Sequence, residues 1–316
     1  MSRMPTMVLC GGVGGARMAN GFAQMGEEGR MLYVVNIGDD FTHVGLRICP
    51  DLDSVAYTLS GLGDAERGWG RGGETWCVNQ ALASLGGPTW FALGDKDIAW
   101  HLLRTASLAA GAPLSLATRE LLDRVECGHR IVPVSDDPIA TRIRCRDGDM
   151  AFQEWFVGHH AEPVVQAIAF EGAAAACLSP PVREVFESGN GYTVVLAPSN
   201  PFLSIDPLLA VPGMREAIRR AVRPVLAVSP IIGGAAVKGP LGKMLADRGD
   251  EVSPVAIARH YQGLADVFLI DEADVAYAGA IEALGMRAVA APLHISDMPS
   301  QLRLARHIDA LLAEDA

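Results

Sequence analysis

The sequence predicts an α/β protein with a Rossmann-like, mostly parallel sheet that has helices on both faces. At both ends of the chain, short apolar runs alternate with amphipathic segments, and this order implies right-handed crossovers between parallel strands. A glycine-rich turn follows the first apolar run, as at the nucleotide-binding turn of such folds. Half of the 316 residues are hydrophobic and a fifth are charged, so the chain can bury a large core.

The predicted elements follow from hydrophobic periodicity. The first part of the chain contains strands and helices in the order strand 6–10, helix 16–26, strand 31–38, and helices 75–86, 97–111 and 116–128. Short strands joined by turns are expected next, at 130–136, 140–145, 150–157 and 164–170. The strand–helix alternation then returns, with strands at 192–201, 224–230, 266–274 and 287–292 and a closing amphipathic helix at 299–314.

This change of character in the middle of the chain predicts one two-lobed domain. We expect residues 1–94 and 190–316 to form a nucleotide-binding core, and residues 95–189 to form a smaller lobe. The sequence contains no internal repeat, low-complexity tract or long flexible linker.

Composition excludes several classes of function. The net charge of −11 argues against non-specific binding to nucleic acid or to an anionic membrane. The first apolar run is too short for a signal peptide, and no window is apolar enough to span a bilayer. The six cysteines lack CxxC spacing and are expected to be reduced. We therefore expect a cytoplasmic protein with no nucleic-acid or membrane partner.

The stretch VLCGGVGGARMANG, residues 8–21, indicates a phosphate-binding turn. Gly11, Gly12, Gly14 and Gly15 let backbone N–H groups approach an anion at a helix N-terminus. No Gly-Lys-Ser/Thr follows, so this is not a Walker loop, and Arg17 stands where the dinucleotide fingerprint has its third glycine. A plain strand-to-helix turn remains the alternative.

Further loops are expected beside this turn, because ligands bind beyond the carboxyl ends of parallel strands. Ser199 and Asn200 lie between two prolines and offer short donors and acceptors for a phosphate or a sugar. Ser229, Gly233 and Lys238 follow the next strand in a similar loop. The alternatives are a simple serine turn in the first loop and a solvated lysine in the second.

Four carboxylates lie within fifteen residues, in NIGDDFTHVGLRICPDLDSV. Such carboxylates suit a hard cation such as Mg²⁺, and we expect Asp39 and Asp53 to hold it. Asp51 follows Pro50 at an expected helix start, where it is equally suited to capping. The role of Asp40 stays open between a ligand and a structural residue.

A second polar cluster lies in WFALGDKDIAWHLLR. Asp95 begins this predicted helix, and Asp97, His101 and Arg104 share one face of it. A salt-bridged face is expected for Asp97 and Arg104, whereas His101 is suited to holding a phosphate or a hydroxyl. Neither zinc-ligand spacing nor a GxSxG nucleophile motif is found.

Nine motifs follow one another in the order of a known family: GGVGGAR, NIGDD, ICPDLDS, GWGRGGET, WFALGDKD, PVSDDP, FQEWFV, APSNPFLSI and VSPIIGG…KGP. From residue 8 to about 271 the sequence resembles the 2-phospho-L-lactate transferase (CofD) family, in its bacterial form. The resemblance implies an Mg²⁺-dependent transferase of coenzyme F-420 biosynthesis. Its donor is a guanosine diphosphate that carries a small carboxylic acid, its acceptor is the ribityl hydroxyl of the deazaflavin Fo, and GMP is released.

The residues named above fit this reaction, which needs positioning and charge neutralisation more than covalent help. Asp39 and Asp53 are expected to be catalytic and to bind the metal. The expected donor-binding residues are Gly11, Gly12, Gly14, Gly15, Ser199, Asn200, Ser229, Gly233 and Lys238. The expected acceptor-binding residues are Asp51, Asp53, Asp95 and His101.

Some alternatives stay open. The bacterial form of the motifs leaves phospholactyl, phosphoenolpyruvyl and phosphoglyceryl donors equally suited. Ala92 replaces a residue that is often basic or polar in relatives, which puts an acceptor contact from that position in doubt. A non-catalytic regulator of the gluconeogenesis-factor type, which binds UDP-sugars, is the main alternative, and an NAD-dependent oxidoreductase is a weaker one. Homo-oligomerisation also stays open.

Overall fold

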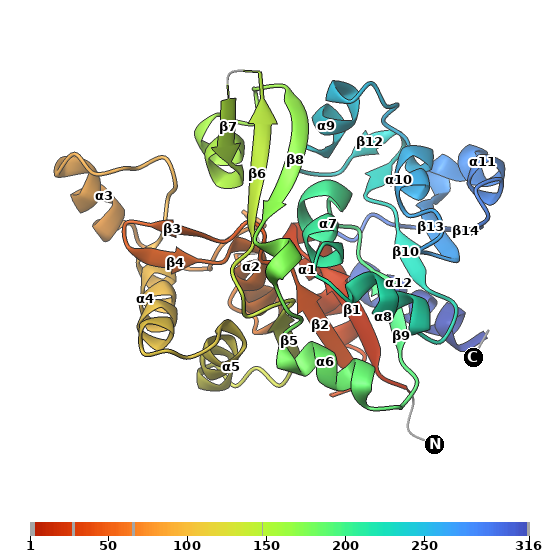
Figure 1. Cartoon of the computed structure of the whole chain (residues 1–316), viewed down its shortest axis with the longest axis horizontal. Helices are drawn as coiled ribbons and strands as arrows, with labels where there is room; N and C mark the ends of the chain where they lie inside the picture. Colours follow the sequence, from red (N-terminus) through yellow and green to blue (C-terminus); the bar gives the residue numbers. More distant parts are fainter. Residues whose placement is uncertain (1–3, 27–28, 65–66, 147, 315–316) are drawn as a thin grey trace.

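The computed structural model describes residues 4–26, 29–64, 67–146 and 148–314, and it confirms the predicted fold class. Its centre is a seven-stranded parallel sheet in the order β14-β13-β10-β9-β1-β2-β5 (Figure 1). The strands are β1 (Thr6–Cys10), β2 (Met31–Val35), β5 (Arg130–Pro133), β9 (Thr193–Leu196), β10 (Leu226–Val228), β13 (Val267–Asp271) and β14 (Arg287–Ala291).

Strand β1 is an interior strand of this sheet, between β9 and β2. Val8 is in register with Tyr33 of β2 on one side and with Val195 of β9 on the other. Every residue of β1 is buried, as expected for a continuous apolar run covered on both faces. The chain passes from β1 to β2 on one side, and it later returns to place β9 on the other side of β1. The order of strands therefore reverses direction at β1. Ligands of open parallel sheets bind at such a point.

The helices cover both faces of the sheet, with α6 and α8 on the near face and α1 and α12 on the far face in Figure 1. The first six are α1 (Gly12–Ala23), α2 (Pro50–Leu59), α3 (Cys77–Ser84), α4 (Asp95–Ala109), α5 (Leu114–Arg124) and α6 (Pro180–Glu187). The others are α7 (Asp206–Leu209), α8 (Met214–Arg220), α9 (Leu241–Asp247), α10 (Pro254–His260), α11 (Ala278–Glu282) and α12 (Met298–Glu314). Helix α1 packs against both α2 and α12.

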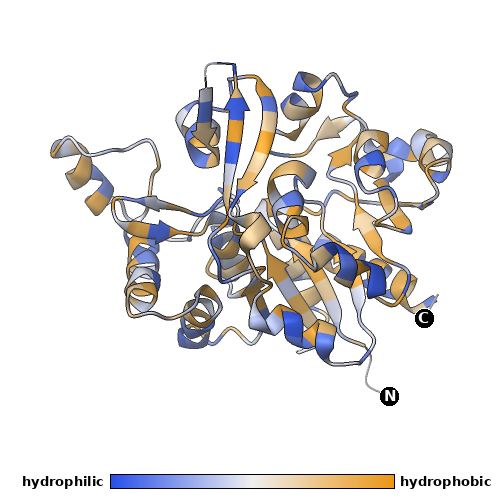
Figure 2. Cartoon of the chain, viewed as in Figure 1, coloured by the Kyte–Doolittle hydropathy of each residue, from blue (hydrophilic) through white to orange (hydrophobic). Residues whose placement is uncertain are grey.

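Short helical turns link several elements: η1 (Glu154–Gly158), η2 (Ala173–Ala175), η3 (Pro201–Ile205) and η4 (Glu272–Tyr277). None of the helices in the described ranges is both long and apolar enough to cross a bilayer. Figure 2 shows that the central strands are mainly hydrophobic, whereas the outer helices carry mixed surfaces.

Three small antiparallel units extend from the central sheet: β3 (Phe41–His43) with β4 (Leu46–Ile48), β6 (Ala140–Cys145) with β7 (Gly148–Ala151) and β8 (Val165–Glu171), and β11 (Ile231–Ile232) with β12 (Ala235–Ala236). Within 95–189, the segment expected to form the smaller lobe, β5 pairs with β2 in the central sheet, whereas β6–β8 form a sheet of their own. Residues 1–3 and 315–316 of the expected core lie outside the described residues.

Several boundaries differ from the sequence prediction, and two of these differences have a clear physical reason. The strand expected at 150–157 ends at Ala151, and a helical turn follows that buries Trp155, whose indole N–H donates to the Pro163 carbonyl at 2.9 Å. Helix α1 begins at Gly12 rather than at residue 16, so the glycines form its first turn. Burial of one aromatic side chain and close approach of the glycine backbone account for these two differences.

Candidate active site

The glycine turn and the loop after β9 meet at the carboxyl edge of the sheet. Ser199 Oγ accepts from the Gly11 N–H at 3.2 Å and donates to the Gly11 carbonyl at 2.7 Å, across 188 residues of sequence. The structure thus brings together the first glycine loop and the Ser199-Asn200 pair. The side-chain Oδ1 of Asn200 caps η3 by accepting from the N–H groups of Phe202 and Leu203, and its Nδ2 lies 3.6 Å from Met244 Sδ.

This contact explains why the turn consists of glycines. A Cβ at Gly15 would lie 2.6 Å from Ser199 Oγ, and one at Gly14 would lie 2.6 Å from the Pro198 carbonyl oxygen. At Gly11 a Cβ would collide with the Asp51 carboxylate. The Ser199 loop and Asp51 can therefore approach the backbone of this turn closely only because these positions carry no Cβ.

Asp51 joins the first turn of α2 to the glycine turn. Its Oδ1 accepts from the Gly12 N–H at 2.6 Å, and its Oδ2 accepts from Asn36 Nδ2 at 3.0 Å. The same Asn36 amide lies 3.3 Å from Asp39 Oδ1, and Gln153 Nε2 lies 3.4 Å from Asp39 Oδ2. The carboxylates of Asp39 and Asp51 are thus held beside each other by one buried amide.

Asn36 is a further residue of this site that the sequence motifs do not single out, although its position gives a signal. It is the first polar residue after the buried strand β2, and it is itself fully buried. A polar side chain at that place needs hydrogen-bond partners, and here these are two of the predicted carboxylates and the Leu203 carbonyl.

Three neighbouring carboxyl groups have raised pKa values. Burial raises the pKa of Asp39 well above its usual range, and the charges of Asp51 and Asp40 add to the effect. Burial raises the pKa of Asp51 to about 6, although Asn36 and Gly12 donate to it. Burial likewise raises the pKa of Asp40 to about 7, even with Arg47 Nη2 at 3.2 Å. Each ionised group therefore carries an electrostatic cost that a bound cation would relieve.

Asp53 occupies a different environment. Arg104 Nη1 donates to Oδ2 at 3.0 Å, Nη2 donates to Oδ1, and the Trp100 indole N–H donates to Oδ1 at 2.9 Å. Both oxygens of the carboxylate are engaged by α4, and the guanidinium neutralises its charge. These partners join α2 to α4. That Asp53 shares a metal ion with Asp39 stays a prediction.

His101 and Asp97 extend this buried network. His101 Nδ1 lies 3.7 Å from Asp53 Oδ2, and its Nε2 lies 3.2 Å from Asp97 Oδ1. The Tyr57 hydroxyl donates to the same Asp97 oxygen at 2.5 Å. The predicted polar face of α4 thus forms, but Arg104 pairs with Asp53 across to α2 rather than with Asp97 on its own helix.

Asp95 caps α3. Its Oδ2 accepts from the Thr75 hydroxyl at 2.5 Å and from the Cys77 N–H at 3.1 Å, and its Oδ1 accepts from the Val78 N–H at 3.0 Å. These hydrogen bonds lower the pKa of the carboxyl group. They give Asp95 a structural role, and its acceptor contact stays a prediction.

The loop after β10 satisfies its own polar groups. Ser229 Oγ accepts from the Ile231 N–H at 3.1 Å and so forms a simple serine turn. The sequence offered such a turn as the alternative for the other serine loop, the one after β9. The N–H groups of Gly233 and Gly234 donate to the buried Asp274 carboxylate at 2.9 and 3.0 Å. Ser229 and Gly233 thus shape the loop and leave Lys238, at its exposed end, as its charged group.

Lys238 meets Arg17 beside Gly68. A Cβ built on Gly68 would lie 3.0 Å from Lys238 Nζ and 3.5 Å from Arg17 Nη2. Two basic side chains from distant parts of the sequence therefore converge within one turn of the glycine-rich start of α1. Because the N-terminus of α1 carries a partial positive charge of its own, this place favours an anion.

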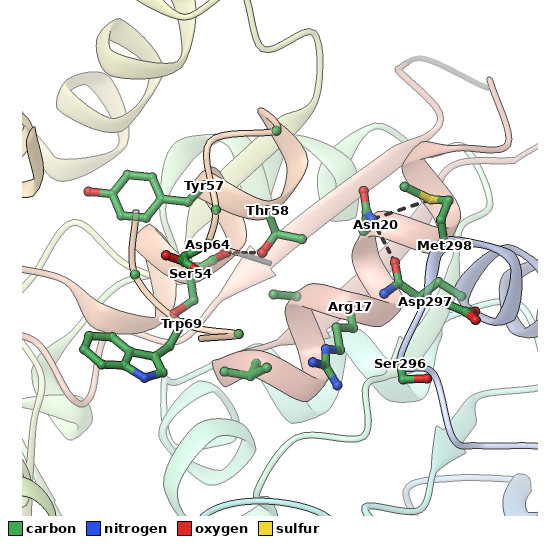
Figure 3. Close-up of a pocket in the computed structure, with 17 residues that line it drawn as sticks. Arg17, Asn20, Ser54, Tyr57, Thr58, Asp64, Trp69, Ser296, Asp297 and Met298 are labelled. Carbon is green, nitrogen blue, oxygen red and sulfur yellow. Dashed lines mark hydrogen bonds between the residues drawn. The ribbon is translucent and has the colours of Figure 1, made fainter. Parts of the chain in front are cut away.

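A pocket of about 420 Å³ opens beside this pair (Figure 3). It lies between α1, α2, residues 61–64 and 68–70, and the start of α12, and Figure 3 shows Arg17, Tyr57 and Trp69 around it. Asn20 Nδ2 donates to Gln301 Oε1 at 2.8 Å on the α12 side. The sequence pattern does not predict this pocket, because Trp69 lies in a glycine-rich stretch without periodicity.

The carboxylate pair fits a divalent cation. Mg²⁺ is commonly held by one or two carboxylates together with substrate phosphates. Within the described ranges, no three or more His, Cys, Asp or Glu side chains form a complete metal-binding set. Asp39 and Asp51, close together and each disfavoured as a buried anion, provide the smaller set that such an ion needs.

Comparisons with known proteins identify relatives over nearly the whole length. The model of the family "2-phospho-L-lactate transferase CofD" matches residues 6–292. The phosphoenolpyruvate transferase of Streptomyces griseus is 43% identical over 317 residues, which cover 98% of this chain and 99% of the relative. That of Thermobifida fusca is 42% identical over 308 residues, 93% of each chain.

Solved structures support the fold. A crystal structure of a upf0052 family member from Bacillus halodurans matches with a TM-score of 0.61 and 14% identity, over 98% of this chain and 99% of that one. This likeness concerns the fold alone. The family match and the identity of more than 40% to full-length transferases go further: the chain belongs to the 2-phospho-L-lactate transferase CofD family.

Proposed function

We propose that this enzyme transfers a phosphoenolpyruvyl group from a guanosine diphosphate donor to the ribityl hydroxyl of Fo, releasing GMP, as a step of coenzyme F-420 biosynthesis. The printed name of relatives at 40–43% identity supports phosphoenolpyruvate as the acid. The single observation that carries the proposal is the meeting of a glycine turn, two buried carboxylates and a basic pair at the carboxyl edge of the sheet.

In this reaction the acceptor hydroxyl loses its proton to solvent, and its oxygen bonds to the phosphorus that carries the carboxylic acid. The bond from that phosphorus to the bridging oxygen breaks, and GMP leaves with the negative charge. Arg17 and Lys238, beside the N-terminus of α1, are suited to hold the diphosphate and to stabilise this charge. The pocket around Tyr57 and Trp69 offers aromatic side chains to a substrate ring.

Asp39 and Asp51 would hold Mg²⁺, with Asn36 fixing the orientation of both carboxylates. A bound Mg²⁺ supplies neutralisation of charge on the transferred phosphoryl group. Asp51 also accepts a hydrogen bond from the Gly12 N–H, and this contact fixes the position of the carboxylate pair relative to the glycine turn. Asp53 acts as a positioning residue, because its ion pair with Arg104 secures the first turn of α2 on α4.

The test is direct. The purified enzyme is incubated with Fo, Mg²⁺ and, separately, the phosphoenolpyruvyl, phospholactyl and phosphoglyceryl derivatives of guanosine diphosphate, and the products are identified by mass spectrometry. We expect the dehydro product and GMP from the phosphoenolpyruvyl donor, at a rate well above those of the other two. Turnover of a different donor alone would overturn the choice of acid, and a lack of product with all three would overturn the reaction.

A binding assay separates the transferase from a UDP-sugar-binding regulator. A ligand that binds the native state raises the melting temperature. We expect GDP to raise it and UDP-N-acetylglucosamine to leave it unchanged, and the reverse result would support the regulator.

A further inference from the structure

Gln153 is a buried amide to which the proposed reaction gives no role. It belongs to the β6–β8 unit, which comprises these three strands and the turn 152–158 after β7. Only 5% of its surface is exposed, and a buried amide needs hydrogen-bond partners. Its Nε2 donates to Asp39 Oδ2 at 3.4 Å, across 114 residues of sequence. The β6–β8 unit therefore contacts one of the two carboxylates that fit a cation.

Aromatic packing fixes the turn that carries this amide. The rings of Phe152 and Phe156 stack with centroids 5.5 Å apart and planes 9° apart, and Trp155 is fully buried. Of the buried residues in 152–158, all of which the structure describes, Gln153 is the polar one. The aromatic side chains therefore determine where its amide lies.

The β6–β8 unit reaches the Asp39 loop at a second point. At the start of β6, the Thr141 N–H donates to the Gly38 carbonyl at 2.6 Å. A Cβ on Gly38 would lie 2.7 Å from Thr141 Oγ1, so the two segments approach this closely because residue 38 is a glycine. The place of Gln153 relative to Asp39 is thus set by direct contacts between the β6–β8 unit and the loop.

On its other side the β6–β8 unit is attached to α9, which lies beside β8 (Figure 1). Lys243 Nζ donates to the Pro163 carbonyl at 3.2 Å, and Asp247 Oδ2 accepts from the Val165 N–H at 3.0 Å. The chain passes from Lys238 into α9 within a few residues. The β6–β8 unit therefore connects the loop of Asp39 to the loop of Lys238 and is held from both.

We propose that Gln153 is a positioning residue of the cation site, which orients Asp39 toward Mg²⁺ and leaves the charge of this carboxylate to the cation. The inference rests on the proposed function, in which Asp39 and Asp51 hold Mg²⁺. Asn36 Nδ2 lies 3.3 Å from Asp39 Oδ1, and Gln153 Nε2 lies 3.4 Å from Oδ2, so each oxygen has one amide donor. Because a carboxylate has about four acceptor positions, two amides leave room for a metal ion.

An uncharged donor suits this task. Amide N–H groups fix the orientation of a carboxylate without compensating its charge, whereas the guanidinium of Arg104 engages both oxygens of Asp53 and neutralises them. A lysine in place of Gln153 would bring its own positive charge to Asp39 and would compete with Mg²⁺. Groups that hold metal ligands in this way commonly account for about 10- to 100-fold in metal affinity.

The effect of Mg²⁺ on the melting temperature at saturating GDP tests the proposal. The Mg²⁺ concentration that gives half of the maximal rise measures the apparent affinity for the cation. Gln153→Met keeps the length of the side chain but lacks the N–H donor, and we expect it to lower this affinity by about 10- to 100-fold. GDP binding without Mg²⁺, measured by calorimetry, should stay unchanged, because the amide acts on Asp39 and not on the phosphate turn.

Two further variants sharpen the test. Gln166→Met is the matched control, because Gln166 is exposed on β8 of the same unit, and it should respond to Mg²⁺ like wild type. Gln153→Lys should abolish the response to Mg²⁺, since its ammonium group would neutralise Asp39. In the Asp39→Asn background, Gln153→Met should cause no further loss, because the two residues act through one contact.

A Gln153→Met variant that responds to Mg²⁺ like wild type would overturn the role of Gln153 and leave the proposed reaction intact. A further loss in the Asp39→Asn background, or a Gln153→Lys variant with the wild-type response, would overturn it as well. A wild-type enzyme without any response to Mg²⁺ would overturn both the cation site and this inference. Circular dichroism checks folding. If Gln153→Met is unfolded, Gln153→Asn serves with the same expected loss, because its amide is one carbon shorter and does not reach Asp39.

Discussion

Arg104 encloses the carboxylate of Asp53. Nη1 donates to Oδ2 at 3.0 Å and Nη2 donates to Oδ1, so the planar guanidinium engages both oxygens, and both side chains are buried. This ion pair holds α2 against α4. It therefore also fixes the position of Asp51, which lies in the same first turn of α2 as Asp53.

Replacement of Arg104 by Met should therefore leave a buried carboxylate without its counter-charge. We expect the free energy of unfolding to fall by about 3–5 kcal/mol, as measured by urea denaturation. The double variant Asp53→Asn/Arg104→Met should recover part of this loss, because the uncompensated charge is gone. A loss below about 1 kcal/mol in the single variant would show that the pair does not hold the helices together.

Asp39→Asn and Asp51→Asn should weaken the response to Mg²⁺. In the presence of GDP, Mg²⁺ is expected to raise the melting temperature of wild type, and each variant should show a smaller rise. If each change removes about 3 kcal/mol of transition-state stabilisation, turnover should fall on the order of 100-fold. Asp95→Asn is the control and should keep both properties, since an Asn side chain can also cap α3. An unchanged Mg²⁺ response in both site variants would remove the metal assignment.

Lys238→Met and Arg17→Met should each weaken GDP binding in calorimetric titrations. Hydrogen bonds to charged groups contribute about 1.5–3 kcal/mol, which corresponds to roughly 10- to 150-fold in the dissociation constant. Arg219, exposed on α8, provides the control, because Arg219→Met removes the same kind of charge away from the site. Equal effects of all three changes would point to net charge rather than to a local phosphate site.

Gly15→Ala should disturb both stability and donor binding, because the new Cβ would lie 2.6 Å from Ser199 Oγ and 3.0 Å from Cys10 Cβ. Overpacking of this kind costs about 1–3 kcal/mol. Gly279→Ala is the matched control in α11, where a Cβ would meet no described atom within 4 Å. Thermal melts and GDP titrations of the two variants measure the difference, and wild-type behaviour of Gly15→Ala would contradict the close approach.

Asp97 is expected to stabilise the fold in a pH-dependent way. Burial raises its pKa, but the hydrogen bond and charge of His101 and the Tyr57 hydroxyl outweigh burial and leave the pKa below the usual value. A carboxyl group whose pKa is lower in the folded state stabilises the protein above its unfolded-state pKa of about 4, and this contribution is lost as the pH falls further. The stabilising contribution of the Asp97 carboxylate, measured as the difference in unfolding free energy between wild type and Asp97→Asn, should therefore be present at pH 5 and shrink below pH 4. A difference that is constant down to pH 3 would be inconsistent with the lowered pKa.

The sequence predicted the central sheet because its strands are short, almost wholly apolar runs, which is the pattern of strands covered on both faces. It also predicted that Ser199 would lie near the first glycines, because the carboxyl ends of parallel strands share one edge. Both predictions depend on local pattern and on a general rule of topology.

The partners of individual side chains could not be predicted in this way. Helical spacing placed Arg104 on the face of Asp97, but only the packing of α4 on α2 shows that it binds Asp53. The meeting of Arg17 and Lys238 depends on the path of a glycine-rich loop without periodicity. Both features depend on contacts between segments whose relative placement no local pattern encodes.

The place of β1 between β2 and β9 has a consequence for synthesis of the chain. Thr6 is in register with Met31 on one side, but its other neighbour, Thr193, is 187 residues away. At a translation rate of about 5–20 residues per second, the second edge of β1 waits roughly 10–40 s for its partner. During that time an apolar strand edge stays open at the centre of the nascent protein, where it can pair with other chains. Fragments that end before β9 should therefore aggregate, and a chaperone that shields this edge would increase the yield of native enzyme.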